Sequence, residues 1–487
     1  MRALVIGAGI GGLTAGALLA QRGWEVTVCE QAAVVGGCAS TFRRGAFVFD
    51  VGATQVAGLE PGGIHHRLFG ELGVPLPEHH PCDPACAVFL PGETAPISVW
   101  RDPVRWQAER QRQFPGSEPF WQFMTHLFEI GWRFQSRDPV LPPRSFWGLG
   151  RLLRALRWET LATFPYTLAT VGDALRGFQV DGDRRLRAFL DLQLKLYSQV
   201  NAEETALLYG ATALGVSQAP RGLYHLQGSM QVLADRLVEA LQRHGGTLRL
   251  RCRAEAIVPK DKPQVLLHDR RTGETWWEET DAVVANVPVQ NLVRLLGELA
   301  PAGYRRRVQN LPPGSVAFVT YLGVKREAIP EGCPPHLQLA DTWGDYERSL
   351  FVSVSQPGDG RAPAGLATIT ASEFSRPEVW WGDIDYKAQK QAYLQAAIAR
   401  LSRYFALEGN IVHGEGGTPR TFARYTGRDG GVVGGVGMRL SEFGPFGFGN
   451  RTPVPHVWLV GDSTHPGEGT AGVSYSALSL VQQLTER

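Results

Sequence analysis

The chain has 487 residues, enough for two or three lobes that each bury a hydrophobic core. Its 49 basic and 47 acidic residues leave a net charge of +2, so the charge balance gives no reason to expect nucleic acid as a partner. The six scattered cysteines are not a disulfide framework. No apolar run approaches the roughly 18 residues that cross a bilayer. We expect an intracellular protein with no signal peptide and no transmembrane span.

A dinucleotide-binding pattern occupies the first thirty residues. An apolar strand leads into a Gly-x-Gly-x-x-Gly turn, and a helix of small residues and a second strand follow. Gly7 permits the tight turn, Gly9 lets the backbone approach a pyrophosphate, and Gly12 lets the helix pack on the strand. The second strand ends at Glu30, about 18 residues after Gly12, within reach of a ribose 2′-hydroxyl.

The residues that follow favour one dinucleotide over the others. An acid at Glu30 disfavours the 2′-phosphate of NADP, which leaves FAD and NAD. Gly36 and Gly37 supply a second stretch of bare backbone beside the phosphates, as flavoproteins commonly do. The pattern therefore favours FAD.

The middle of the chain alternates between helical and strand-like segments. Residues 104–210 are predicted to be mostly helical, and a helix over 230–243 precedes a strand that starts at 248 and runs to 252. The further predicted elements are strands or hairpin strands at 87–90, 96–100, 264–268, 276–277, 281–286, 316–324, 349–355 and 366–371, and a helix at 386–405.

One stretch of the helical region, residues 144–158, is amphipathic. Four leucines share one face of the predicted helix, and four arginines share the other: Leu149, Leu152, Leu153 and Leu156; Arg144, Arg151, Arg154 and Arg157. A basic amphipathic helix can lie in a membrane interface. The alternative is a surface helix whose leucines pack on the core.

The C-terminal part returns to α/β character. A strand over 457–460 ends in Gly461 and Asp462, and a Gly-rich loop leads to a helix from Ala471. The carboxylate of Asp462 is suited to bond hydroxyls of a flavin. A helix N-terminus near Val473 would stabilise negative charge that develops on a reduced flavin.

The order of these elements predicts an α/β fold with a discontinuous nucleotide-binding domain. We assign residues 1–75, 223–290 and 411–487 to a Rossmann-like FAD-binding domain. Residues 76–222 and 291–410 are then an inserted α+β domain that binds substrate and faces the membrane.

Several motifs together resemble the FAD-dependent carotenoid desaturase and isomerase family. Beside the N-terminal pattern they are residues 224–230, 281–286, 424–426, 434–435 and 461–467. Within the family, residues 49–59 and 190–200 are most similar to the carotenoid 3′,4′-desaturases of cyanobacteria. The resemblance implies a fold of the amine-oxidase and phytoene-desaturase type, an apolar tunnel, a carotenoid substrate and a membrane surface as partner. It leaves the electron acceptor open, with a quinone or oxygen as candidates.

The resemblance also implies where FAD binds. The positions carried over are Gly7, Gly9, Gly12, Glu30, Gly37, Ala254, Gly461, Asp462 and Val473. Many relatives carry an arginine after the Gly-Gly pair, whereas this chain has Cys38. Arg43 or Arg44 is expected to compensate, unless the backbone alone holds the phosphates.

Desaturation of a carbon–carbon bond needs a hydride acceptor, which a flavin supplies and no side chain can. A base then takes a proton. His465 is our candidate for this role, with Glu468 as a weaker one that could equally be a helix-side anion. We expect no metal, because the spacing of His79, His80 and Cys82 with the next cysteine matches no standard zinc pattern.

Three alternatives stay open at this point. A carotene cis–trans isomerase would use the same fold with reduced FAD and no net oxidation. A flavin amine oxidase is disfavoured because no cysteine near the C-terminal loop offers covalent attachment. A prenyl carrier on this fold would bind lipid without redox chemistry, but an intact Gly7, Gly9, Gly12 and Glu30 argue against it.

Overall fold

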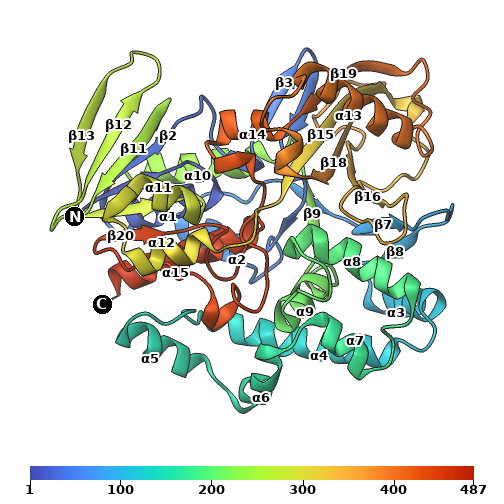
Figure 1. Ribbon diagram of the computed structural model, residues 1–487, viewed down its shortest axis with the longest axis horizontal. Helices are drawn as coiled ribbons and strands as arrows, with labels where there is room; N and C mark the ends of the chain where they lie inside the picture. Colours follow the sequence, from blue (N-terminus) through green and yellow to red (C-terminus); the bar gives the residue numbers. More distant parts are fainter. Residues whose placement is uncertain (487) are drawn as a thin grey trace.

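The structure is a computed structural model, and it describes residues 1–486. Its centre is a parallel five-stranded sheet in the order β10-β2-β1-β14-β20 (Figure 1). The strands are β1 (Arg2–Ile6), β2 (Glu25–Glu30), β10 (Thr247–Leu250), β14 (Ala282–Ala285) and β20 (Val457–Leu459). This strand order places the first strand beside a topological switch point, where dinucleotides bind in doubly wound sheets.

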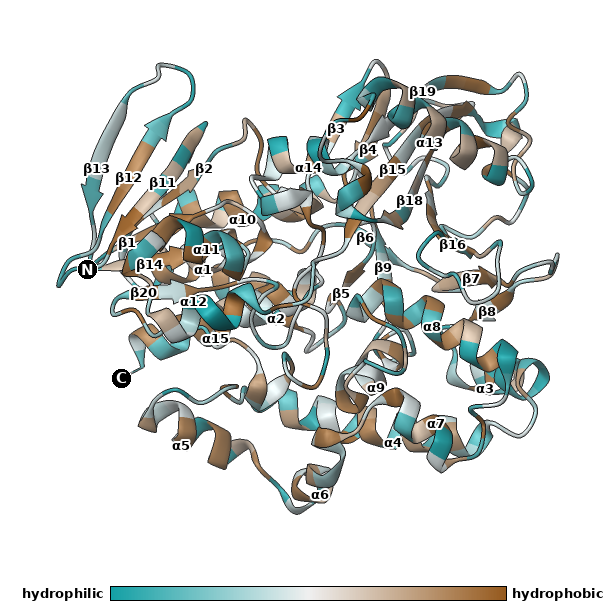
Figure 2. Cartoon of the chain, viewed as in Figure 1, coloured by the Kyte–Doolittle hydropathy of each residue, from teal (hydrophilic) through white to brown (hydrophobic). Residues whose placement is uncertain are grey.

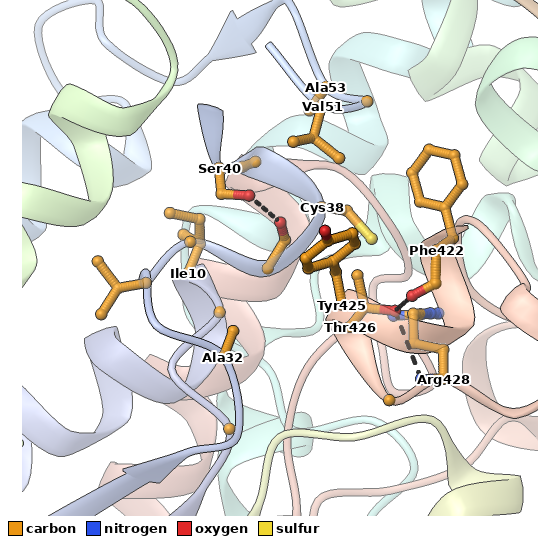
Figure 3. A pocket seen from close by; sticks show the side chains of 18 of the residues that line it. Ile10, Ala32, Cys38, Ser40, Val51, Ala53, Phe422, Tyr425, Thr426 and Arg428 are labelled. Atoms are coloured by element: carbon orange, nitrogen blue, oxygen red, sulfur yellow. Dashed lines mark hydrogen bonds between the residues drawn. The ribbon is translucent and has the colours of Figure 1, made fainter. Parts of the chain in front are cut away.

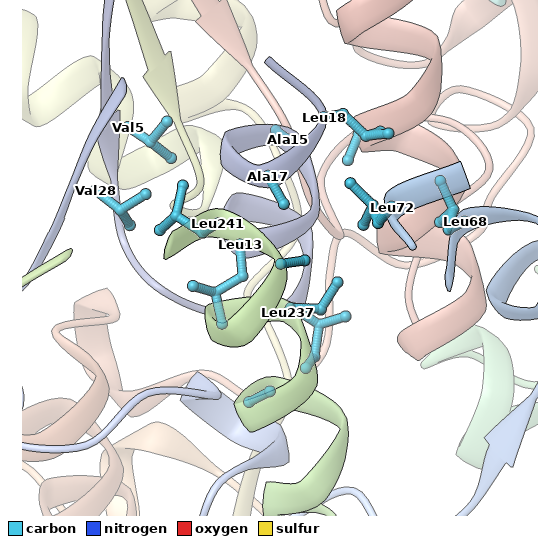
Figure 4. Close-up of a cluster of buried hydrophobic side chains, with 14 of the residues drawn as sticks. Val5, Leu13, Ala15, Ala17, Leu18, Val28, Leu68, Leu72, Leu237 and Leu241 are labelled. Carbon is cyan, nitrogen blue, oxygen red and sulfur yellow. The ribbon is translucent and has the colours of Figure 1, made fainter. Parts of the chain in front are cut away.

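Helices with small and branched apolar residues cover this sheet. The helices α1 (Ile10–Gln21), α10 (Gln231–Arg243), α15 (Thr470–Thr485) and α2 (Ile64–Leu72) share one hydrophobic core with β1 and β2. Figure 4 shows Leu13 of α1 among Val5, Val28 and Leu241. Because α1 is buried along nearly its whole length, it is held firmly at the end of β1.

A three-stranded antiparallel sheet continues from β10. It consists of β11 (Cys252–Val258), β12 (Gln264–Asp269) and β13 (Thr275–Glu279). The strand predicted from 248 through 252 is wrong in one respect, because Arg251 has a positive φ of 58° and separates β10 from β11. The two strands therefore belong to different sheets.

A seven-stranded sheet forms the second lobe, in the order β19-β15-β18-β17-β16-β7-β8 (Figure 1). All neighbours are antiparallel except β16 and β7. The strands are β7 (Cys86–Phe89), β8 (Ile97–Val99), β15 (Val316–Lys325), β16 (His336–Leu339), β17 (Leu350–Val354), β18 (Leu366–Ser375) and β19 (Ile411–Gly417). Helix α13 (Tyr386–Leu401) packs on it through Leu394, which meets Phe318 and Trp380.

Short elements connect the two lobes. They are the hairpin β3 (Thr41–Arg44) and β4 (Phe47–Asp50), the small sheet β5 (Val56–Ala57), β9 (Leu223–Leu226) and β6 (His79–Pro81), and helices α11 (Val289–Leu296), α12 (Ala302–Gln309) and α14 (Pro419–Thr426). Phe49 of β4 packs in a cluster with Val319 and Tyr321 of the seven-stranded sheet. The hairpin thus ties the dinucleotide end to the second lobe.

The predicted helical region is confirmed as a separate layer below the seven-stranded sheet in Figure 1. It contains α3 (Pro103–Gln113), α4 (Glu118–Gln135), α5 (Phe146–Ala155), α6 (Trp158–Ala162), α7 (Val171–Gly177), α8 (Arg184–Ser198) and α9 (Leu207–Gly215). The single helix predicted over 144–158 is wrong. The backbone leaves the helical region at Leu156 (ψ 142°) and Arg157 (ψ 164°), and a new helix starts at Trp158.

The predicted α/β fold is confirmed, but sheet membership differs from the predicted division at two places. Strand β19, which we assigned to the nucleotide-binding part, pairs with β15 in the seven-stranded sheet. Helices α11 and α12, which we assigned to the inserted part, bury Leu292 and Val308 against Val283 of the central sheet. The middle segment of the nucleotide-binding domain therefore extends to about residue 309, and its last segment begins only after β19.

None of the helices in residues 1–486 combines the length and the apolar character needed to cross a lipid bilayer.

Candidate cofactor and substrate site

A single large cavity of about 1190 Å³ joins the two lobes. It begins at the carboxyl ends of β1, β2, β14 and β20, where Gly7, Glu30, Asn286 and Gly461 line it. It ends against the seven-stranded sheet and α14. That volume is above the usual range of about 300–1,000 Å³ for a small-molecule site, so it has room for more than one ligand.

The turn after β1 is built for close approach of another backbone or a phosphate. A Cβ atom on Gly7, whose φ is +94°, would stand 2.7 Å from the carbonyl oxygen of Asn286. One on Gly9 would stand 2.9 Å from the Asn286 amide nitrogen, and one on Gly12 would stand 2.1 Å from the carbonyl oxygen of Gly7. No side chain caps the N-terminus of α1, so its N–H groups face the cavity as an anion site.

Glu30 is held rigidly at the end of β2. Its Oε2 accepts a hydrogen bond from the N–H of Ala8 and its Oε1 accepts one from Ala32, both at 2.8 Å. Burial raises the pKa of the Glu30 carboxyl, and the backbone hydrogen bonds oppose that rise. The carboxylate keeps lone pairs toward the cavity, which suits it to accept from ribose hydroxyls.

Gly36 and Gly37 pack against the turn that contains Gly7 and Gly9. The N–H of Gly36 donates to the carbonyl of Ala8 at 2.8 Å, and a Cβ on Gly37 would lie 3.5 Å from the Cα of Gly9. Both glycines line the cavity. Two strips of bare backbone therefore face each other where the motif places the pyrophosphate.

Arg428, a cation near Cys38, was not among the residues predicted for this site. Arg43 and Arg44 both line the cavity as expected, but they are exposed, and Arg44 pairs with Glu415 at 2.8 Å. Arg428, which follows α14 (Figure 3), is a further cation on the wall: its charge lowers the pKa of Cys38 against the effect of burial, and it pairs with Asp462 at 2.8 Å. No local pattern around Arg428 indicates this role, because the pair forms only when α14 packs beside the loop after β20.

The N-terminus of α15 also faces the cavity. Its N-cap residue Gly469 has a φ of +86° and no side chain caps the helix. Gly469, Thr470 and Val473 line the wall, and the Thr470 hydroxyl has no hydrogen-bond partner among the described residues. On the opposite side of the dinucleotide end, Ala254 lines the cavity at a bulge in β11.

The far wall is mainly apolar, with the Arg44–Glu415 pair among its few charged residues. Figure 3 shows Phe422 and Tyr425 of α14 near Cys38 and Val51. The other apolar lining residues there are Phe42, Ala317, Val319, Tyr321 and Phe374. This wall suits a hydrocarbon ligand.

The cavity wall brings together all the predicted cofactor residues except Gly12, and the predicted base, His465, does not lie on it. Gly12 does not line the cavity and serves the packing of α1 on Gly7. His465 does not line it either: its Nε2 lies 3.2 Å from the side-chain oxygen of Gln135, and its ring meets Phe443 and Tyr475. Burial lowers the pKa of His465 to about 4. This placement gives His465 no contact with a ligand in the cavity.

Among residues 1–486, no group of three or more His, Cys, Asp or Glu side chains is arranged to hold a metal ion. The ring of His79 hydrogen-bonds to the carbonyl of Pro77, and burial raises the pKa of the Cys82 and Cys86 thiols to about 12. Such thiols are poor metal ligands because the thiolate is the ligating form.

The dinucleotide end therefore fits FAD, since its glycines leave a cradle that a single Cβ would fill. The description "Flavin containing amine oxidoreductase" matches residues 10–484. The chain belongs to this family. Members are flavoenzymes, so the predicted FAD cofactor and the predicted oxidoreductase class are confirmed.

Among curated proteins, this flavin oxidoreductase is 26% identical over 500 residues to the chloroplastic prolycopene isomerase of Daucus carota, covering 99% of this chain and 79% of that one. It is 25% identical over 513 residues to a 4,4′-diapophytoene desaturase of Staphylococcus haemolyticus, covering 100% and 99%. Among solved structures it is similar to the cyclohexylamine oxidase of Brevibacterium oxydans, with a TM-score of 0.64, 16% identity and coverage of 100% and 99%. That last likeness shows the fold.

Proposed function

We propose that this flavin oxidoreductase desaturates a carotenoid, at the 3′,4′ bond of a monocyclic 1′-hydroxy carotenoid. The observation that carries the proposal is the continuity of the cavity between the dinucleotide end and the apolar wall of Phe42, Val319 and Phe374. The likeness to a diapophytoene desaturase over the whole chain supports the substrate class. The 3′,4′ position rests on the resemblance of residues 49–59 and 190–200 alone.

In this proposal the chain's residues bind and orient. Glu30 accepts from the ribose, the N-terminus of α1 faces the pyrophosphate, and Asp462, held by Arg428, accepts from flavin hydroxyls. The N-terminus of α15, which faces the cavity, would stabilise negative charge on the reducible ring. FAD, when bound, supplies the hydride acceptor. The apolar wall holds the polyene and excludes water.

A carotene cis–trans isomerase is a second candidate, favoured by the likeness to a prolycopene isomerase over nearly the whole chain. The two functions differ in electron balance. Desaturation removes two hydrogens and reduces the flavin, whereas isomerisation conserves mass and needs a flavin that is already reduced.

One experiment separates the candidates. The FAD-loaded protein is incubated anaerobically with a monocyclic 1′-hydroxy carotenoid in liposomes, and flavin absorbance and product mass are followed. Bleaching with a product two hydrogens lighter supports the desaturase. Unchanged mass with a shifted cis/trans ratio, seen only after pre-reduction, supports the isomerase. Re-oxidation of the bleached protein by oxygen or by a quinone identifies the acceptor.

We also propose that the helical layer docks on a membrane, from which the substrate enters. Helices α5 and α6 lie at the edge of the molecule, and α5 carries hydrophobic segments there (Figure 2). Phe146 is 96% exposed, Trp158 is 88% exposed, and Phe164, in the 3₁₀ helix that follows α6, is 71% exposed. Monomeric surfaces rarely gather such large apolar side chains without a partner.

Helix α5 does not match the alternative of a surface helix whose leucines pack on the core. Leu149 and Leu153 of α5 are exposed rather than packed on the core. Arg151 turns inward, where it donates to the side-chain oxygen of Gln482, and the other three arginines, Arg144, Arg154 and Arg157, remain exposed at the rim. Apolar side chains with arginines beside them match an interface with anionic lipid.

The test is flotation with anionic liposomes. Replacing Phe146, Trp158 and Phe164 by serine is expected to reduce the floated fraction at least tenfold. Trp277→Ser is the matched control, because Trp277 is half exposed but lies on β13, outside this surface. Unchanged flotation of the triple variant would contradict docking of the helical layer on a membrane.

A further inference from the structure

Glu468 is a carboxylate on the cavity wall, directly before the N-terminus of α15. It lies in the loop between β20 and α15 and lines the wall beside Asp462 and Gly434. Its carboxylate oxygens accept hydrogen bonds from the side-chain amide of Gln199 at 3.0 and 3.1 Å, and Oε2 accepts one from the N–H of Gly435 at 3.0 Å. Three elements, α8, the loop after α14 and the loop after β20, therefore aim this carboxylate.

The other carboxylates on the cavity wall are already committed or exposed. Glu30 is held by two backbone N–H groups, Asp462 by Arg428 and Glu415 by Arg44. Asp235 is exposed. Glu468 and Glu30 are the enclosed lining carboxylates with no cation within ion-pair distance among the described residues, and of the two Glu468 lies away from the end of β2, where the motif places the ribose. It is therefore free to change its protonation state without breaking an ion pair.

The surroundings of Glu468 bring its pKa close to neutral pH. Burial raises the pKa of Glu468 to about 7, and the negative charge of Asp462 adds to the rise. The hydrogen bonds from Gln199 and Gly435 and the charge of Arg428 act against it. The other titratable groups that face it, the Tyr209 hydroxyl and the Cys38 thiol, carry pKa values raised by burial and stay neutral. A base is most effective when its pKa is near the working pH.

We propose that Glu468 is the catalytic residue that accepts the proton lost by the substrate. This inference rests on the proposed desaturation. FAD, when bound, would supply the two-electron oxidant that accepts hydride, the hydrogen and the electron pair of one C–H bond. The neighbouring C–H bond breaks, its electron pair forms the new double bond, and the proton goes to the carboxylate of Glu468. Atoms and charge then balance without a further reactant.

Glu468→Gln tests the assignment, because an amide keeps an acceptor for Gly435 but cannot take a proton. The variant is expected to bind FAD with the wild-type dissociation constant and to slow anaerobic bleaching by a carotenoid at least ~10²-fold. The wild-type rate should rise with pH and level off above about 7. Glu468→Asp should recover part of the rate. Glu60→Gln is the matched control, since burial also raises the pKa of Glu60 and it does not line the cavity.

A second readout does not depend on turnover. The infrared band of a protonated carboxyl should disappear as the pH rises through about 7 in the wild type and in Glu60→Gln, and be missing from Glu468→Gln. Bleaching by Glu468→Gln within threefold of the wild type, or the same band in that variant, overturns the assignment of Glu468. A wild-type protein that leaves the flavin oxidised overturns the proposed desaturation itself, so the two failures are distinguishable.

Discussion

Arg361 anchors a buried charge cluster between the two lobes, and we expect its removal to cost much of the stability of the protein. Its guanidinium donates to Oδ2 of Asp50 at 2.9 and 3.0 Å, to Asp359 at 3.2 Å and to the carbonyl of Leu226 at 2.9 Å. The other oxygen of Asp50 accepts from the N–H of Met230, just before α10. Arg361 and both aspartates are at most 5% exposed.

Arg361→Met leaves the buried Asp50 carboxylate without a cation and leaves Asp359 with the ring of His225, at 2.9 Å, as its side-chain partner. Removing one partner of a buried ion pair costs about 3–5 kcal/mol, because the remaining charge stays desolvated. Since domains are stable by only about 5–15 kcal/mol, the change is a large part of the total. The unfolding equilibrium constant should rise by roughly two to three and a half orders of magnitude.

The assay is urea unfolding of the FAD-loaded protein, followed by flavin and tryptophan fluorescence. The control is Arg376→Met, which removes a 3.7 Å ion pair to Glu347 from side chains that are 77% and 51% exposed. The control should lose less than about 0.5 kcal/mol. A loss below about 1 kcal/mol for Arg361→Met would refute the reasoning, because it would mean that the two aspartates are hydrated or protonated in the folded protein. Asp50→Asn combined with Arg361→Met should recover part of the loss.

Three further predictions follow from single contacts. Gly12→Ala should weaken FAD binding at least tenfold by equilibrium titration, because its Cβ would meet the Gly7 oxygen at 2.1 Å; Gly70→Ala in α2, whose Cβ meets nothing within 4 Å, is the control and should bind normally. Arg428→Met should weaken FAD binding by about tenfold or more, since Asp462 loses its 2.8 Å partner; unchanged affinity would exclude that role. Burial lowers the pKa of His65 to about 4, so on acidification the unfolded state binds a proton before the folded state does. The free energy of unfolding therefore falls as the pH drops from about 6.5 toward 4. His65→Leu should flatten that slope by up to about 1.4 kcal/mol per pH unit, and a variant with the wild-type acid profile would contradict the prediction.

The elements that were predicted correctly are those whose signal is local. They include the turn at Gly7 and Gly9 and the acid Glu30, which lie within one βαβ unit, and the helix that ends at Arg243. In such units, backbone conformation and apolar periodicity depend on residues a few positions apart.

Local signals failed where a distant contact decides the outcome. Residues 144–158 have the periodicity of one helix, yet the chain breaks at Leu156 and turns Arg151 inward toward Gln482 of α15. Residues 411–417 follow the long helix α13, and only pairing with β15 assigns them to the second lobe. In each case a partner far away in the sequence determines the conformation.

The sequence alone determined the dinucleotide end, because its glycines and Glu30 act through backbone geometry that neighbouring residues set. The tertiary structure decided the chemistry of the wall. It moved His465 away from the cavity, brought Arg428 to Asp462, and enclosed Glu468 so that burial raises its pKa to about 7. Desolvation and charge pairing depend on which distant side chains pack together, and this information exists only in the folded chain.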